Sequence, residues 1–232
     1  MSLIEDRTTP APEPSDGRKV RGDRTRRAIL TAAVNLASVE GLEGLSIGRL
    51  AAELDMSKSG LFAHFGSKED LQIATVRAAA AIFGHRVVVP AEQQFEPGIA
   101  RLQGMLDNWL DYMERGIFAG GCFFAAATIE MDGRPGPVRD SVAHQMTRWA
   151  ETLADYARAA IERGELRADT DPEQLAFELD ALGTGVNSGW QLHEDAVVFE
   201  RGHRAIRRRL EADATEAGRA ALARAAAVSL AA

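Results

Sequence analysis

The sequence is patterned for helices from one end to the other. Apolar residues recur every three or four positions, as at Ile29, Ala33, Leu36 and Ala37, and this is the period of one face of an α-helix. The sequence lacks the alternating apolar and polar runs of half-buried strands, and the short apolar run 87–89 ends at Pro90. The sequence therefore predicts an all-α fold.

Glycine, proline and small polar residues divide this pattern into segments. Residues 1–17 are rich in proline, threonine and acidic residues and are predicted to be a disordered leader. Helices are expected over 24–40, 47–54, 58–65, from 67 toward Pro90, along an apolar face from 99 to 113, over an apolar segment 121–131, and over 138–163, 172–193 and 196–211. Gly41 and Gly66 are expected to stop helices and Ser46, Ser57 and Asp171 to cap them. The alanine-rich tail 212–232 has little to bury, so we expect it to fray.

Composition excludes several classes of protein. The 232 residues are 46% hydrophobic, which is enough for a core. The N-terminus lacks the pattern of a secretory signal and no long apolar run is evident, so a cytoplasmic protein outside the membrane is expected. The single cysteine, Cys122, cannot form an internal disulfide or a zinc cluster. Cys122 and His144 fall on different expected helices, and no phosphate loop or metal-spaced set is present. Neither enzyme activity nor a cofactor is predicted.

Basic residues gather near the N-terminus although the net charge is −7. The segment 18–27, RKVRGDRTRR, holds a single acidic residue. Because salt screens charges beyond about 10 Å, this local field matters more to DNA than the net charge does. Arg18, Lys19, Arg21 and Arg24 can reach phosphates or a narrow minor groove, or the segment can be a solvated, partly disordered run. Both interpretations stay open.

The segment 46–70, SIGRLAAELDMSKSGLFAHFGSKED, gives the strongest functional signal. Two short helices joined by the turn 55–57 are typical of a helix-turn-helix, whose second helix can place its N-terminal residues against base edges. Lys58, Ser59 and Gly60 stand at that end. Gly60 costs about 1 kcal/mol of helix stability relative to alanine, a cost that the close approach of another backbone would explain. A small helical bundle that binds no DNA can show the same pattern.

The same segment resembles the TetR family of bacterial one-component regulators, from about Thr25 to Leu71. The matching positions are Ser46, Ala51-Ala52, Ser57-Lys58, Gly60-Leu61, His64-Phe65 and Lys68-Glu69. The resemblance implies an N-terminal three-helix DNA-binding domain, taken as 18–70, and a larger helical domain, 71–211, that binds a small effector and dimerises.

The resemblance also implies roles for single residues. Contacts to the DNA backbone are expected from Thr25, Ser46, Phe62, His64 and Lys68, and approach to the bases from Lys58, Ser59 and Gly60. Two positions depart from the family pattern. Phe62 stands where the family usually has tyrosine, which puts that hydroxyl contact in doubt. Asp55 stands where the family usually has glycine, at a turn that is expected to be left-handed.

The remaining helices supply candidates for the effector site and the dimer interface. The residues that can line a ligand cavity are Trp109, Met113, Phe123, Phe124, Trp149 and Phe177, with Asn187, Trp190 and His193 as weaker candidates. Plain core packing is the alternative for each. Gly183, Gly185 and Gly189, together with the face formed by Phe199, His203, Ile206 and Leu210, suggest two helices in an interface with a second copy. Packing within one chain is the alternative.

These features predict a homodimeric transcriptional regulator that binds double-stranded DNA. A repressor that leaves a palindromic operator when a small molecule binds fits them best. A ligand-independent regulator or an activator is the nearest alternative, and a helical enzyme or interaction protein that binds no DNA is the distant one. The sequence identifies neither the effector nor the operator.

Overall fold

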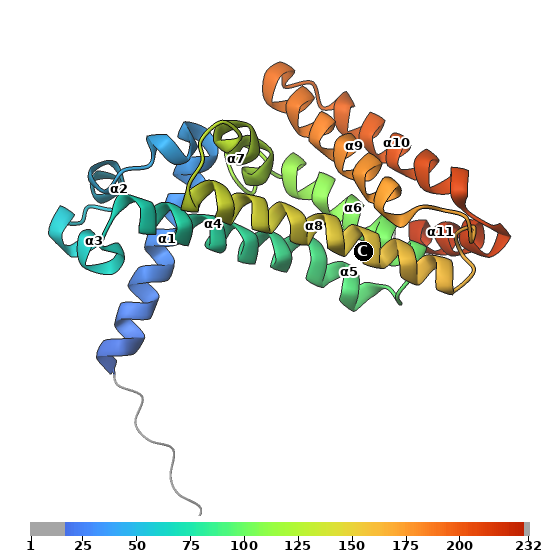
Figure 1. The fold of residues 1–232 in the computed structure, drawn as a ribbon, viewed down its shortest axis with the longest axis horizontal. Helices are drawn as coiled ribbons and strands as arrows, with labels where there is room; N and C mark the ends of the chain where they lie inside the picture. Colours follow the sequence, from blue (N-terminus) through green and yellow to red (C-terminus); the bar gives the residue numbers. More distant parts are fainter. Residues whose placement is uncertain (1–16, 230–232) are drawn as a thin grey trace, which may run out of the picture.

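The computed structural model describes residues 17–229, so nearly all of the expected leader lies outside the described residues. The all-α class is confirmed over this range, where β-pairing is limited to an isolated bridge between Leu166 and Ala214. The molecule is elongated (Figure 1). Helices α1 to α3 form one end and α9 to α11 gather at the other, while α4 and α8 run between the two ends.

The first end of the molecule consists of α1 (Gly17–Gly44), α2 (Ile47–Glu53) and α3 (Lys58–Phe65). Left-handed backbone at Gly41 (φ 79°), Asp55 (φ 50°) and Gly66 (φ 71°) interrupts or ends these helices, as expected at all three positions. Ser46 and Ser57 cap α2 and α3 by accepting backbone N–H bonds. These local signals explain why the boundaries of α2 and α3 follow the sequence so closely.

The helix expected to run toward Pro90 is divided into three parts. It comprises α4 (Lys68–Phe83), a π-helical turn (Gly84–Val88) and α5 (Val89–Gln94). Pro90 has no N–H to donate to the preceding turn. The backbone hydrogen-bond pattern of the helix changes just before Pro90. There the N–H of Val89 bonds to the carbonyl of Gly84, five residues back instead of four.

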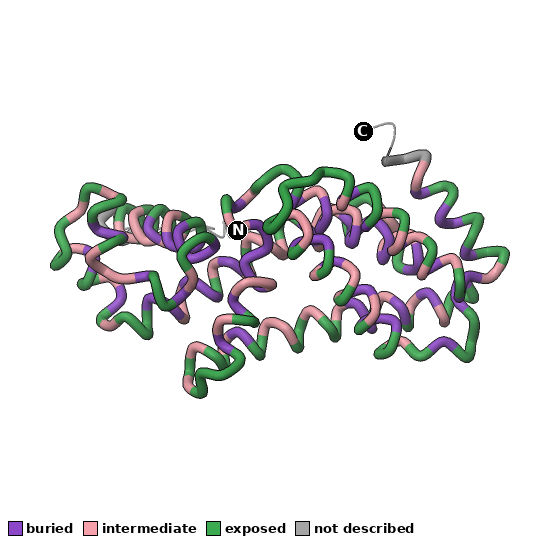
Figure 2. Tube along the Cα trace, turned by 90° about the horizontal axis from the view of Figure 1, so that it is seen from above, coloured by how far each residue is buried: buried purple, intermediate pink, exposed green. Residues whose placement is uncertain are grey.

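The other helices surround a central one. Helix α6 (Ile99–Glu114) packs against α5, α8 (Pro137–Glu162), α9 (Pro172–His193) and α10 (Val197–Asp213), and α7 (Phe123–Met131) lies between α1 and α8. Leu102, Met105 and Leu106 of α6 are completely buried. Buried and exposed positions alternate along the peripheral helices in Figure 2, as amphipathic helices around one core require.

Two expectations about the C-terminal part were wrong. The alanine-rich tail forms α11 (Glu216–Ser229), which does find a surface to bury: it packs on α6 with Leu222 completely buried. Residues 230–232 lie outside the described part. Phe199, Ile206 and Leu210 of α10 are also buried within the chain, so this face is filled by α6 and α9 and is not available to a second copy.

The helical run Lys68–Gln94 is long and apolar enough to cross a membrane by length and composition, although no such run was expected from the sequence. Core helices of soluble proteins pass the same test. This run packs against α1, α6 and α8, and 28% of its most apolar stretch is buried inside the structure.

Candidate nucleic-acid interface and effector cavity

The outer side of α3 presents the side chains expected to meet DNA. Lys58 and Ser59 are exposed and Phe62 is 51% exposed, whereas Leu61 and Phe65 are buried in the three-helix core. A shallow hollow on this surface is lined by Ile47, Gly48, Lys58, Ser59, Phe62 and Ala63. The surface is therefore partly apolar, with an exposed phenyl ring and a lysine next to each other.

A local contact accounts for Gly60. The Ser57 hydroxyl accepts the Gly60 N–H at 3.1 Å, and a Cβ at position 60 would lie 3.0 Å from that oxygen. The Ser57 and Ser59 hydroxyls are 3.3 Å apart. The glycine therefore keeps the cap of α3 uncrowded, which explains its presence whether or not DNA approaches it.

Several of the expected DNA-backbone contacts already have partners inside the protein. The Lys68 ammonium donates to the Glu43 carbonyl at 2.9 Å and to its carboxylate at 3.3 Å, and this hydrogen bond holds the pKa of Glu43 below its usual range. The Ser46 hydroxyl accepts the Arg49 N–H. Thr25 and His64 are half-buried. A phosphate would therefore compete with existing bonds at Ser46 and Lys68.

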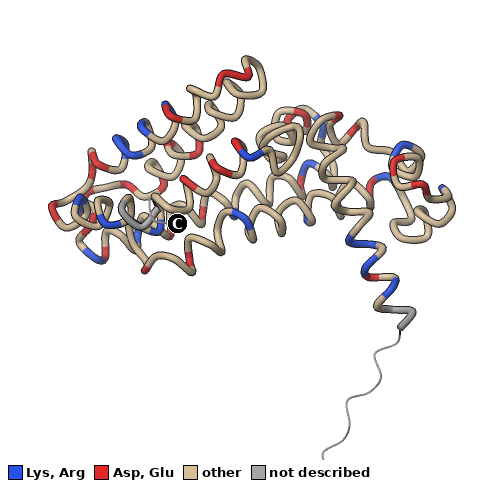
Figure 3. The backbone as a smooth tube through the Cα atoms, turned by 180° about the vertical axis from the view of Figure 1, so that it is seen from behind, with Lys and Arg blue, Asp and Glu red and all other residues tan. Residues whose placement is uncertain are grey.

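The basic segment 18–27 is helical and forms the projecting N-terminal turns of α1. Arg21, Arg24 and Arg27 are exposed there. Figure 3 shows Lys and Arg concentrated along this projection. The side chains of Arg18 and Lys19 lie outside the described residues.

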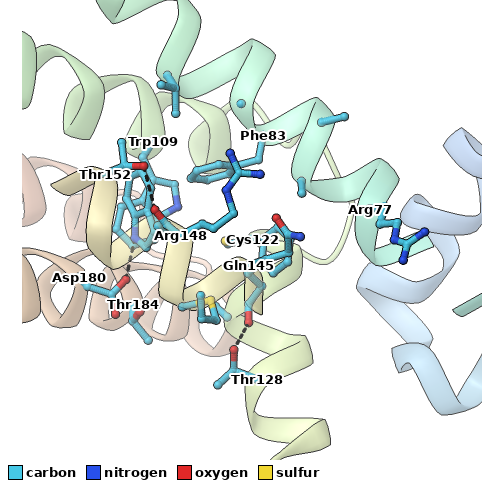
Figure 4. Close-up of a pocket in the computed structure, with 18 of the residues that line it drawn as sticks. Arg77, Phe83, Trp109, Cys122, Thr128, Gln145, Arg148, Thr152, Asp180 and Thr184 are labelled. Carbon is cyan, nitrogen blue, oxygen red and sulfur yellow. Dashed lines mark hydrogen bonds between the residues drawn. The ribbon is translucent and has the colours of Figure 1, made fainter. Parts of the chain in front are cut away.

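A cavity of about 590 Å³ opens between α4, α7 and α8, with contributions from α6 and α9 (Figure 4). Its size is within the range of small-molecule sites. Its lining residues are Arg77, Ala80, Ala81, Phe83, Gly84, Val88, Trp109, Cys122, Phe124, Ala125, Thr128, Ile129, Gln145, Met146, Arg148, Trp149, Thr152, Asp180 and Thr184. The π-helical turn thus begins at the cavity wall, a common location for such turns.

Aromatic rings form the inner wall of the cavity. The rings of Phe83 and Trp149 are perpendicular, with centroids 5.1 Å apart, and Trp109 lies 5.3 Å from Trp149. Trp109 can sit against α9 only because position 183 is glycine, since a Cβ there would lie 2.0 Å from the indole ring. Gly183 is therefore used in packing within the chain.

Asp180 is the acidic residue of this cavity. Its Oδ1 accepts the indole N–H of Trp149 at 2.9 Å. Burial raises the pKa of Asp180, and the bond from Trp149 opposes that shift. Burial also raises the pKa of the Cys122 thiol, as expected of an unreactive core cysteine. Within residues 17–229, no group of three His, Cys, Asp or Glu side chains is arranged to hold a metal ion.

The cavity contains half of the residues expected to line it. Trp109, Phe124 and Trp149 do so, whereas Met113 and Phe123 are buried in the core away from it. Phe177 is 69% exposed on the outer face of α9. The placement expected for these last three residues was wrong, because helical periodicity does not say which neighbour an apolar face meets.

The weaker cavity candidates also lie elsewhere. Asn187 is buried and accepts the Cys122 N–H at 2.8 Å, and Trp190 packs on Phe199. His193 is exposed at the end of α9. Asp180 was not among the residues expected in the cavity, although it stands on the buried side of α9 between Ala176 and Gly183. An acidic residue within an apolar stripe was the available signal.

Helix α7 joins the cavity to the DNA-binding end. Thr128 and Ile129 line the cavity, and the adjacent Glu130 carboxylate accepts the N–H groups of Leu42 at 2.7 Å and Glu43 at 2.8 Å. These N–H groups follow the left-handed Gly41. The carboxylate therefore caps the last turn of α1 from the cavity wall.

The loop before α7 makes a second connection to α1. Gly120 donates its N–H to the Ser38 hydroxyl at 3.1 Å, and Ala119 donates to the Asn35 side chain at 3.2 Å. A Cβ at Gly120 would lie only 1.8 Å from the Ser38 carbonyl oxygen. The two backbones are thus in direct contact.

Comparison with known proteins agrees with this arrangement. Residues 29–75 match the profile described as bacterial regulatory proteins, tetR family, and residues 98–206 match the tetracyclin repressor-like C-terminal domain. The HTH-type transcriptional regulator TcmR of Streptomyces glaucescens is 25% identical over 89% of this chain and 92% of its own length. A TetR transcriptional regulator from Chloroflexus aurantiacus superposes with a TM-score of 0.77 at 26% identity, over 84% of this chain and 98% of that one.

A further similar structure is AibR, solved in complex with isovaleryl coenzyme A and operator DNA. It has a TM-score of 0.62 and 23% identity, over 78% of this chain and 94% of that chain. Profiles for both the DNA-binding and the C-terminal domain thus match in the expected order. The chain belongs to the TetR family of DNA-binding transcriptional regulators, a family without enzymatic activity.

Proposed function

We propose that the protein is a cytoplasmic, homodimeric repressor that binds a palindromic operator and releases it when a small molecule enters the cavity. The observation that supports this proposal best is that α7 both lines the cavity and caps the end of α1 through Glu130. Helix α4 adds a second connection, because it starts directly after α3 and also lines the cavity. AibR, which has a similar fold, was solved with both isovaleryl coenzyme A and operator DNA, so one such fold can hold both kinds of partner.

On the DNA side, α3 is proposed to lie in the major groove with Lys58, Ser59 and Gly60 nearest the bases. Thr25, Ser46, His64 and Lys68 are proposed to contact phosphates. Phe62 has no hydroxyl to donate, so we assign its exposed ring to an apolar contact with a thymine methyl group or a sugar.

For the dimer, we propose the exposed face of α9 alone in place of the interface expected from α9 and α10 together. This stripe consists of Phe177, Ala181, Gly185, Ser188 and Leu192. The two large apolar residues at its ends are 69% and 77% exposed. A Cβ at Gly185 would meet nothing within 4 Å, so a second helix can approach closely there. A twofold pair of such stripes would set two recognition helices on one operator.

On the effector side, Trp109, Phe124 and Trp149 are proposed to contact the ligand. A ligand between α4, α7 and α8 would favour those conformers in which these helices stand further apart. Because α4 and α7 both contact α1, such conformers would reposition α3 relative to the partner's copy. The loss of DNA affinity would equal the ligand's difference in affinity between the two conformers.

The first test is selection of binding sites from random duplex DNA with the purified full-length protein. Enrichment of an inverted repeat with half-sites about one helical turn, roughly 34 Å, apart would support binding of the operator by a dimer. Enrichment of single half-sites only would refute the dimer. No enrichment from a folded protein, with candidate ligands absent and present, would refute specific operator binding. A selected site whose affinity no cavity ligand changes would identify a ligand-independent regulator.

A further inference from the structure

We propose that the effector contains a cationic ammonium group, which binds against the rings of Phe83 and Trp149 with Asp180 as its counter-ion. This inference rests on the proposed role of the cavity as the effector site. It adds the chemical class of the ligand, which the family relationship does not supply.

The carboxylate lacks a cationic partner. Among the described residues, Asp180 has one hydrogen-bond partner, the Trp149 indole, and forms no ion pair. A carboxylate that is largely removed from water and unpaired is unfavourable, as the raised pKa of Asp180 also indicates. A ligand cation would provide the missing charge, so the same group that costs stability in the free protein would strengthen binding.

The rings beside the carboxylate are suited to the same ligand. Phe83 and Trp149 are half-buried lining residues and meet at 90°. Phe83 also lies 6.3 Å from Trp109 and 6.3 Å from Phe124, so four rings that line the cavity gather around Phe83. Aromatic faces attract cations, and quaternary ammonium groups are commonly bound by several rings together.

Two arginines in the cavity lining would favour an anionic ligand instead. Arg77 and Arg148 are both exposed to solvent, where salt screens their charges. Figure 4 shows Arg77 on the far side of the close-up from Asp180. Among the described residues, neither arginine forms a hydrogen bond or an ion pair with Asp180, whose carboxylate bonds to the Trp149 indole. The arginines therefore do not neutralise the carboxylate, and an anionic ligand is the competing outcome of the test.

Calorimetric titration of the full-length protein with three probes that share a benzyl group separates these possibilities. The probes are benzyltrimethylammonium, its uncharged carbon isostere neopentylbenzene, and the anion phenylacetate. We expect the cation to bind at least about tenfold more tightly than the isostere, since a desolvated cation–π contact and an ion pair act together. The cavity of about 590 Å³ has room for all three probes.

Two variants assign the preference to Asp180. Asp180→Asn keeps an oxygen for the Trp149 N–H and removes the charge. It should weaken binding of the cation about tenfold and leave the neutral isostere within about twofold. Glu151→Gln removes one charge from an exposed position of α8 and should change neither affinity. Circular dichroism of each variant verifies that it is folded.

Each result decides the proposal. Tighter binding of neopentylbenzene or phenylacetate than of the cation would overturn it, as would a cation preference that survives Asp180→Asn. If none of the three probes binds to a protein that still selects an operator, this proposal is refuted, whereas the proposed function as a regulator is not. Cation binding without operator selection would refute the proposed function alone.

Discussion

The contact between Glu130 and the end of α1 provides a direct test of how the cavity is joined to the DNA-binding end. Its carboxylate accepts two backbone N–H groups, from Leu42 and Glu43, at 2.7 and 2.8 Å. Glu130→Gln keeps the shape of the side chain but leaves one oxygen to accept. The amide NH2 then faces the second N–H, donor against donor.

The size of the effect follows from these two bonds. A hydrogen bond to a charged group contributes about 1.5–3 kcal/mol. The bond to Leu42 is partly buried and the bond to Glu43 is exposed, so the second is weaker. We therefore expect Glu130→Gln to lower the free energy of unfolding by about 2 kcal/mol. The ligand-induced change in operator affinity should fall as well, because α7 no longer holds the last turn of α1.

Urea unfolding of the full-length protein at one fixed concentration measures the first quantity, since the apparent stability of a dimer depends on concentration. Fluorescence anisotropy with the selected operator measures the second. Asp132→Asn, an exposed carboxylate two positions further along, is the matched control. A Glu130→Gln protein as stable as this control, with an unchanged ligand response, would show that the contact does not transmit the signal.

Three further changes test other parts of the structure. Phe62→Tyr restores a hydroxyl on the outer face of α3 and should raise operator affinity by up to about tenfold, the gain from one phosphate hydrogen bond; anisotropy that shows no gain would place the ring away from a phosphate. Gly185→Glu puts a charge at an open position of the α9 stripe and should yield monomers in light scattering, while Gly133→Glu, also open, should not; two dimeric variants would exclude this stripe as the interface. The hydrogen bond that His203 Nδ1 donates to the Asp107 carboxylate raises the pKa of His203 even though burial opposes that shift. The pair therefore stabilises the fold fully at pH values below the unfolded pKa of histidine, about 6.5, and this stabilisation is lost as pH rises through the folded pKa of His203. In urea unfolding, the difference in free energy of unfolding between wild type and His203→Gln should shrink from about pH 6 to pH 8.5. A difference that stays constant with pH would refute the assignment.

The DNA-binding end could be predicted closely because its signals are local. The Ser57 cap, the left-handed Asp55 and the Gly66 stop all act within one turn of the chain. Local hydrogen bonds and backbone angles depend on residues a few positions apart, so one sequence contains the required information. The exposed outer face of α3 has the same local origin, because Leu61 and Phe65 on its inner face are buried in the three-helix core.

The cavity and the interface could be predicted only in part because they depend on which helices meet. An apolar stripe predicts burial but does not name the partner, so α10 and α11 both pack on α6 where an intermolecular face and a frayed tail were expected. Phe177 was placed in the cavity for the same reason. The presence of Pro90 does not determine where in the preceding helix the hydrogen-bond pattern changes, so the position of the π-helical turn could not be predicted.

Gly120 has a consequence for genetics. Its backbone touches the Ser38 carbonyl, so a methyl group there would meet an atom that no change of rotamer can move. Even alanine would force the loop and α1 apart, although the residue lines neither the cavity nor the outer face of α3. A screen for mutants that have lost regulation but still accumulate protein should therefore recover Gly120 as well as ligand and DNA contacts. In a family alignment this glycine would be retained for the fit between two backbones, and a reader looking only for chemically active residues would pass over it.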